Sequence, residues 1–534
     1  MADELTRVAE DSARGSFFLV TGTAFATIIM AVSSIIVARL LGPESYGQYT
    51  LALVVPGMLF LFTDLGINHG IIRYTASLCQ EKQVGNIIKI IRYGLVLRAL
   101  AGTTIFIITY LFSDAFASLL LQRSDLAWFV KIASLSILFQ VISTTVASFF
   151  VGLDKTEYNA LIANIQAITK AITSIVLVIL GFNIFGAILG HVISYIISAA
   201  IGMLILAIIL RDFRQQNLRE YSNNPNDGSI LKDLVKYGAP IYVALLLTNF
   251  IPSYQNMILA LFTADINIGN YKAAVNFITL MTVLTAPITT ALLPAFSKLN
   301  STENRKLQDF FRLANKYVTL ITLPAAFLII SLSKEIIYII YGSEYQLAPD
   351  FLALHSLIYL LTGLGYITLP SLFNGLGETK ATLKVSLLAF ILVIAISPLL
   401  TQKYGVQGAI ASLIIANTAS TLYGMSISKR RLQVKFDIKT IAKIYMVSAA
   451  SVIPVFLLTQ TVDMPKILTV AAGGLIYLFT YATLIPLTRT ITAPELKTLA
   501  SIMWKIKFPS PIIKPILKYE QKVLGLKIKR FNLT

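Results

Sequence analysis

Long apolar segments alternate with short polar ones along almost the whole chain. A helix that crosses the roughly 30 Å hydrocarbon core of a bilayer needs about 20 apolar residues. The segments that meet this requirement are fourteen in number and cover residues 16–41, 46–70, 88–112, 127–152, 157–181, 184–210, 236–262, 270–296, 309–332, 350–373, 380–400, 405–428, 440–460 and 466–488. The first is too long for a signal-peptide core, and no A-x-A cleavage site follows it. The pattern predicts an all-α polytopic membrane protein.

Composition strengthens this prediction. Of the 534 residues, 56% are hydrophobic and only 13% are charged, whereas a soluble domain is about 25% charged. So few charges cannot cover the surface of a soluble protein of this size, which argues against a soluble enzyme, a disordered protein or a nucleic-acid-binding protein. The single cysteine, Cys79, excludes an intramolecular disulfide. The histidines lack metal-binding spacing, so no metal site is expected.

The excess of positive charge carries topological information. The chain has 44 Lys and Arg residues against 26 Asp and Glu, a net charge of +18. With the N-terminus placed inside, 35 of these cations fall in inner loops and the two termini, and seven fall on the outer side. This asymmetry predicts an even number of spans with both termini in the cytoplasm.

The two halves of the chain resemble each other at one constant offset. Gly186, Gly202 and Tyr46-Gly47 are matched by Gly408, Gly424 and Ile268-Gly269, and Gly152 faces Gly375 with a shift of a single position. The offset joins spans 1–6 to spans 7–12 and predicts a parallel repeat, which in transporters places the substrate site between the halves near the midplane. The predicted parts are a six-helix bundle at 1–210, a cytoplasmic linker at 211–235, a second bundle at 236–430, two further spans at 431–489 and a tail at 490–534.

Ionisable residues inside spans are costly and are therefore the first candidates for a functional site. Lys170 lies near the middle of its span, too deep to reach an interface easily, and is expected to face a cavity or a buried partner. Arg98 would suit bidentate phosphate binding, although its side chain could also extend to the cytoplasmic face. Asp64 could bind a coupling cation or proton, or simply pair with a neighbouring cation.

Residues nearer the span ends are weaker candidates. Arg73 could capture a phosphate at entry or only set the orientation of its loop. Lys131 and Lys272 lie near the outer face and could form a release site. Asn256 could hydrogen-bond sugars or a neighbouring helix. The basic tail at 490–534, with lysines spaced among apolar residues, predicts a helix on an anionic inner leaflet, and it carries no recognisable nucleic-acid-binding module.

Residues 37–49 read VARLLGPESYGQY, and residues 62–74 read FTDLGINHGIIRY. These motifs, with Arg39, Gly42, Gly47 and Tyr49 as hallmark positions, resemble the polysaccharide-export flippases of the MOP superfamily, the Wzx-type oligosaccharidyl-lipid or O-antigen flippases. The resemblance implies two MATE-like six-helix bundles plus two C-terminal helices. It also implies export of a polyprenyl-(di)phosphate-linked oligosaccharide to the outer leaflet. The family often carries an acidic residue where this chain has Asn256, which puts an acidic role there in doubt.

The resemblance further implies a monomeric transporter, not an enzyme, in the plasma (inner) membrane of a prokaryote. No cofactor is expected, and a coupling Na⁺ or H⁺ is left open. A multidrug exporter of the same fold is the main alternative. It would favour carboxylates in its cavity, whereas Asp64 alone opposes the cations in the spans. A membrane glycosyltransferase or polymerase is a weaker alternative, because no D-x-D motif occurs.

Overall fold

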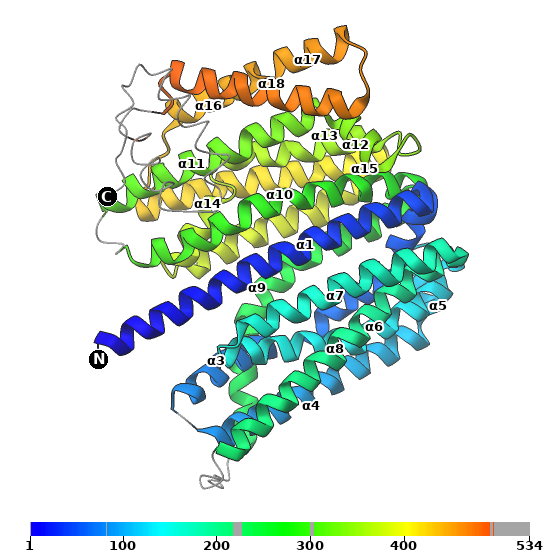
Figure 1. Cartoon of the computed structure of the whole chain (residues 1–534), viewed down its shortest axis with the longest axis vertical. Coiled ribbons are helices and arrows are strands. Elements are labelled where there is room, and N and C mark those ends of the chain that lie inside the picture. The colour runs from blue at the N-terminus through cyan, green and yellow to red at the C-terminus, as the bar shows by residue number, and fades with distance from the viewer. Residues whose placement is uncertain (1, 82, 217–226, 300–303, 492–494, 496–534) are drawn as a thin grey trace. The chain divides into compact units, whose positions relative to one another are not determined.

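The structure, a computed structural model, describes all residues except 1, 82, 217–226, 300–303, 492–494 and 496–534 (Figure 1). Every element in this described part is helical, which confirms the all-α prediction. The elements up to residue 216 are α1 (Ala2–Ala52), α2 (Val54–Phe60), η1 (Leu61–Thr63), α3 (Ile67–Gln80), α4 (Val84–Leu111), α5 (Ser113–Leu119), η2 (Ser124–Leu126), α6 (Ala127–Gly152), α7 (Thr156–Leu177), η3 (Val178–Phe182) and α8 (Asn183–Gln216). The later elements are α9 (Asp227–Phe262), α10 (Asp265–Ser297), α11 (Asn304–Ser331), α12 (Ser333–Tyr341), α13 (Ala348–Ser356), η4 (Leu357–Leu364), α14 (Thr368–Gly375), α15 (Thr379–Leu432), α16 (Ile438–Ala450), α17 (Val452–Thr461) and α18 (Lys466–Leu487).

The chain is a multi-pass membrane protein. In its described part, ten helical stretches are long and apolar enough to cross a bilayer, or eleven with one bent pair. Three of them are 43, 57 and 54 residues long, far longer than one crossing needs. Each of the three contains a residue in the left-handed region, Gly42 (φ 73°), Gly181 (φ 91°) or Gly405 (φ 58°), at a kink between two predicted spans. The count of fourteen crossings stays a prediction.

Left-handed residues interrupt two of the predicted spans. The span predicted at 46–70 is interrupted by Leu65 (φ 47°) and Gly66 (φ 82°). The span predicted at 350–373 is broken at Gly365 (φ 93°), and its two parts are bent by 47°. A left-handed residue ends the ladder of backbone hydrogen bonds, so the helix must stop there and restart in a new direction.

The described chain divides into two compact units. The first comprises Met1–Val283, Tyr341–Phe351 and Ser386–Ala416. The second comprises the described residues of Leu284–Ile340 and Leu352–Val385, and those from Asn417 onward. The core of the first unit packs isoleucine and phenylalanine side chains from α3, α4 and α6. The core of the second packs phenylalanine and leucine side chains from α10, α11 and α14. The bundle and linker boundaries given above stay predictions.

The internal repeat is visible in the backbone. Asn183, at the junction between η3 and α8, has φ 44° and ψ −129°. Its repeat partner Gly405, inside α15, has φ 58° and ψ −137°. Positive φ is uncommon for residues other than glycine. The same rare conformation therefore occurs at equivalent positions of the two halves.

The repeat is also visible in the packing within each unit. A Cβ atom added at Gly202 would lie 2.8 Å from the Ile162 side chain. A Cβ atom added at Gly424, the repeat partner of Gly202, would lie 3.5 Å from the Val385 side chain. At the offset that relates Gly202 to Gly424, the repeat partner of Ile162 is position 384, and Val385 is the next residue. The two halves thus share helix contacts as well as sequence.

The predicted linker at 211–235 lies partly, and the tail at 490–534 almost entirely, outside the described residues. Within the described part, Glu495 accepts a 2.8 Å ion pair from Lys316 on α11. The predicted membrane contact of the tail stays a prediction.

Candidate functional site

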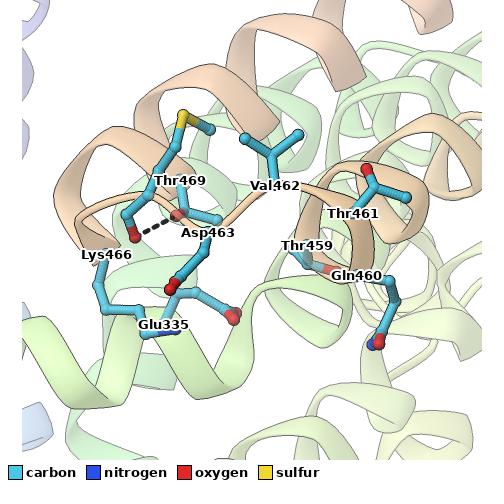
Figure 2. A pocket seen from close by; sticks show the side chains of 9 residues that line it. Glu335, Thr459, Gln460, Thr461, Val462, Asp463, Lys466 and Thr469 are labelled. Carbon is cyan, nitrogen blue, oxygen red and sulfur yellow. Dashed lines mark hydrogen bonds between the residues drawn. The ribbon is translucent and has the colours of Figure 1, made fainter.

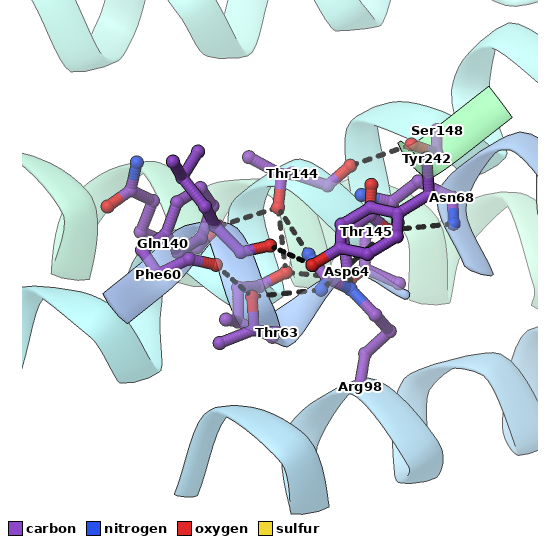
Figure 3. A network of polar contacts seen from close by, with 12 residues as sticks. Phe60, Thr63, Asp64, Asn68, Arg98, Gln140, Thr144, Thr145, Ser148 and Tyr242 are labelled. Carbon is purple, nitrogen blue, oxygen red and sulfur yellow. Dashed lines mark hydrogen bonds and ion pairs between the residues drawn. The ribbon is translucent and has the colours of Figure 1, made fainter. Parts of the chain in front are cut away.

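Arg98 lies at the centre of a polar network in the first unit (Figure 3). Its side chain is 1% exposed. The guanidinium donates to the hydroxyls of Thr63 at 3.0 Å, Thr145 at 3.1 Å and Thr144 at 3.2 Å. Its Nη1 atom also lies 3.8 Å from the Asp64 carboxylate. The guanidinium is therefore enclosed by partners within the described part of the chain, and a role in binding substrate stays a prediction.

This network holds the interruption of the second predicted span together. The chain runs through η1 to Asp64, leaves the helical conformation at Leu65 and Gly66, and restarts as α3. The Asp64 side chain accepts a hydrogen bond from the backbone N–H of Asn68 at 3.1 Å, so it satisfies one of the unpaired donors in the first turn of α3. Asp64 itself is 27% exposed, which leaves it accessible to a proton or a cation.

Helix α9 packs directly against the same interruption. The Tyr242 hydroxyl donates to the Leu61 carbonyl at 3.1 Å, an acceptor close to the point where the helix ends. One turn earlier on α9, a Cβ atom added at Gly238 would collide with the carbonyl oxygen of Gly66. A broken helix at membrane depth needs such neighbours to satisfy its backbone groups. Contacts with α9 therefore stabilise the interrupted form of this span.

A cavity of about 320 Å³, here called the α1–α7–α10 cavity, opens among these three helices of the first unit. Its walls are formed by Thr23, Ala26, Thr27, Met30, Ala31, Ser34, Ala163, Gln166, Asn276 and Thr279. Asn276 donates to the Tyr46 hydroxyl at 2.5 Å, and Gln166 donates to the Ser194 hydroxyl at 3.3 Å. The polar side chains among the described lining residues carry hydroxyl and amide groups and no carboxylate. Such groups can exchange hydrogen bonds with the hydroxyl groups of a sugar.

Two predicted lysines continue the walls of this cavity. Lys170 follows Gln166 by four residues on α7, and Lys272 precedes Asn276 by four residues on α10. Residues four apart share one helix face, so each lysine lies one turn beyond a cavity residue. Neither ammonium forms a hydrogen bond or an ion pair with any residue that the structure describes. Lys170 lies near enough to His191 for an electrostatic interaction.

The hallmark motif forms a close helix crossing. Gly47 on α1 and Gly269 on α10 face each other, and a Cβ atom at either position would lie 3.1 Å from the backbone nitrogen of the other. The same Cβ atoms would collide with the carbonyl oxygens of Asp265 and Pro43, respectively. The two glycines are repeat partners, and so are the two residues that supply the carbonyls. Because equivalent residues of the two halves contact each other reciprocally, the crossing lies on the axis that relates the halves. The sequence motif alone does not reveal this position.

Beside this crossing, an ion pair joins the residue before η2 to the first residue of α10. The Arg123 guanidinium donates to the Asp265 carboxylate at 2.9 Å and to the Thr263 carbonyl at 2.9 Å. Gln48 of the hallmark motif donates to the other oxygen of Asp265 at 3.2 Å. Sequence reasoning missed Asp265, although its position next to the repeated Ile268-Gly269 could have drawn attention to it.

The other predicted residues lie apart from the cavity lining. Arg39 and Arg73 are exposed. Lys131 lies over the Tyr110 ring at 4.6 Å from its centroid, a cation–π contact that holds its charge at the helix surface. Tyr49 is buried, at 5% exposure. Asn256 is half-buried, and it is the neighbouring Gln255 that donates to the Ala409 carbonyl at 3.0 Å.

The fold is that of the MOP-superfamily transporters. The structure is similar to that of a lipid II flippase, MurJ, in an inward closed conformation, with a TM-score of 0.68 at 19% identity over 88% of this chain and 99% of that chain. It is also similar to an inward-facing multidrug resistance MATE family transporter, with a TM-score of 0.62 at 19% identity over 76% and 94% of the two chains. A MATE transporter of Vibrio cholerae gives a TM-score of 0.53 at 17% identity over 80% and 98%.

The sequence places the chain within this class. It belongs to the polysaccharide biosynthesis protein family, whose sequence pattern matches residues 12–300. It is also 24% identical, over 412 residues, to a Shigella flexneri protein named "Putative O-antigen transporter", covering 75% of this chain and 93% of that protein. The resemblance drawn from the hallmark motif is confirmed.

Proposed function

We propose that the protein is a flippase that moves a polyprenyl-(di)phosphate-linked oligosaccharide from the cytoplasmic to the outer leaflet by alternating access. The observation that carries the proposal is the α1–α7–α10 cavity, with Lys170 and Lys272 one turn beyond it. A sugar-phosphate head group cannot cross hydrocarbon without losing its hydration. The cavity would receive the sugar hydroxyls, and the two ammonium groups would offset the phosphate charge.

The positions of the two lysines along α7 and α10 fit transport of the substrate toward the outer leaflet. With the N-terminus inside, α7 runs outward and α10 runs inward, so Lys170 and Lys272 both lie on the outer side of the cavity. An inside-negative potential favours the same direction, by about 2.3 kcal/mol for each negative charge per 100 mV. Asp64 is the candidate for a coupling cation or proton, because its carboxylate is partly exposed beside Arg98.

A multidrug exporter of organic cations fits the cavity less well. Cations are held by carboxylates, and no Asp or Glu lines this cavity among the described residues. The name of the Shigella flexneri relative, an O-antigen transporter, agrees with an oligosaccharide substrate. We further propose that the protein acts as a monomer in the plasma membrane of a prokaryote.

Replacing either lysine by alanine is expected to slow flipping by roughly tenfold, because a charge-assisted contact to phosphate contributes about 1.5–3 kcal/mol. Purified variants Lys170→Ala and Lys272→Ala would be reconstituted into liposomes with a fluorescent sugar–diphosphate–polyprenol, and the lipid that becomes accessible outside would be measured. The matched control is Lys403→Ala, since Lys403 is an exposed lysine that does not line the cavity. Wild-type rates in both variants and in their double mutant would remove the lysines from the proposal.

The topology makes a separate prediction. In a Cys79→Ser background, a cysteine placed at Ser343 is expected to react with a membrane-impermeant thiol reagent added to intact cells. A cysteine placed at Lys435 is expected to react only after permeabilisation. Both positions are exposed, so access across the membrane decides the result. If the cysteine at Lys435 reacted in intact cells and the cysteine at Ser343 reacted only after permeabilisation, the predicted orientation in the membrane would be wrong.

A further inference from the structure

The second unit contains a cavity of its own, with a volume of about 290 Å³ (Figure 2). Its walls come from the hairpin of α17 and α18 and from the first turn of α12. The charged residues among its lining are Glu335, Asp463 and Lys466. At roughly 30 Å³ for each water molecule, this volume has room for a small head group.

The cavity contains a buried carboxylate that needs a partner. Glu335 is 7% exposed, yet its side chain forms no hydrogen bond or ion pair with any residue that the structure describes. Burying an unpaired charge is costly. Figure 2 shows Asp463 and Lys466 directed toward the region of Glu335. Lys466 forms no ion pair with Glu335 among the described residues, so the cavity offers two carboxylates and one ammonium that is not already paired with Glu335.

This arrangement matches a ligand that carries both charges. A primary ammonium would pair with Glu335 and Asp463, and a phosphate would pair with Lys466. A quaternary ammonium cannot donate hydrogen bonds, and the described lining residues include no aromatic ring to hold one. The chemistry therefore selects a phosphoethanolamine group over a phosphocholine group.

The surroundings show where such a group would come from. Val462, Leu457, Ile467 and Leu468, on or next to the same hairpin, are 44%, 55%, 66% and 54% exposed. Large apolar side chains this exposed in a membrane protein face lipid tails. The loops that form the cavity follow the ninth and thirteenth predicted spans, which both end on the outer side. The cavity thus lies at the predicted level of the outer-leaflet head groups.

We propose that the α12–α17–α18 cavity binds the head group of phosphatidylethanolamine from the outer leaflet, with Glu335 as its principal ammonium partner. The bound lipid supplies the counter-charge that Glu335 lacks. It also anchors the two helices that lie outside the internal repeat. This site is independent of the proposed flippase cavity.

Native mass spectrometry of the full-length protein tests this assignment. The protein would be equilibrated with equal amounts of phosphatidylethanolamine, phosphatidylcholine and phosphatidylglycerol, and the retained lipid adducts would be counted. The wild-type protein is expected to retain phosphatidylethanolamine preferentially. Glu335→Gln is expected to lower that preference by roughly tenfold, which corresponds to about 1.4 kcal/mol. Lys466→Gln is expected to weaken binding as well.

Matched controls separate the site from general lipid binding. Glu157→Gln and Lys403→Gln remove exposed charges from residues of the first unit that do not line this cavity, and they are expected to leave the preference unchanged. A wild-type protein without the preference, or a folded Glu335→Gln variant that keeps it, would overturn the proposal. If soluble phosphoethanolamine displaced the lipid with equal affinity, the site would belong to a free metabolite rather than to a membrane lipid.

Discussion

Replacing Gly47 or Gly269 by alanine is expected to stop flipping and to lower the Tm of the protein. Each added methyl group would collide with a backbone carbonyl, that of Asp265 or of Pro43, and a backbone atom cannot turn aside as a side chain can. Overpacking of this kind costs about 1–3 kcal/mol. Both helices would have to move apart, and they would do so where the repeat axis passes between them.

The experiment compares each variant with Gly57→Ala. Gly57 also lies in a helix of the first predicted bundle, α2, but a Cβ atom there would meet nothing within 4 Å. Thermal unfolding in detergent and flipping in liposomes would be measured for all three variants. Normal flipping and an unchanged Tm in both Gly47→Ala and Gly269→Ala would show that the crossing is not tight in the working protein.

Arg98→Ala is expected to destabilise the protein by about 3 kcal/mol. Removing one partner of a buried pair leaves the other charge uncompensated, at a typical cost of about 3–5 kcal/mol. The lower end applies because Asp64 is 27% exposed and can recover some hydration. Three threonine hydroxyls also lose their donor. A role in phosphate binding alone would give a folded variant that fails to transport, whereas the burial of Arg98 makes a loss of stability the expected result.

A double mutant distinguishes this explanation from a direct role in substrate binding. If the cost comes from the unpaired carboxylate, Asp64→Ala in the Arg98→Ala background is expected to restore part of the lost Tm. Arg211→Ala, which removes an exposed arginine at the end of α8, serves as the control. A stable Arg98→Ala protein that binds substrate but no longer flips it would instead support the cavity assignment.

The features that depend on composition or on local periodicity could be predicted from the sequence. The apolar segments define the helices, and the glycines at one constant offset define the repeat. The interruption at Leu65 and Gly66 was not predicted, because a single glycine in an apolar segment is also common in continuous helices. The prediction there fails because Arg98, Tyr242 and Gly238 stabilise the broken form, and these contacts join segments far apart in the chain.

The two cavities show the same limit. Thr23, Thr27 and Ser34 recur on one face of an apolar helix, a signal that could have been read from the sequence. Their meeting with Asn276 could not be predicted, since it joins distant segments. Glu335 gives no sign of burial, because it occurs in a short polar connection of the kind that normally faces water.

The positive-φ residues Asn183 and Gly405 have a consequence for what the cell displays. At each of them the chain passes from one helix into the next without a connecting loop. Exposed loop tips are where proteases cut and where inserted sequences are tolerated. Both junctions lie on the side predicted to face outward. External proteases, phages and antibodies therefore find no extended loop to bind or cleave at these two positions. Epitope tags for surface detection belong elsewhere, for example in the longer connection between α12 and α13.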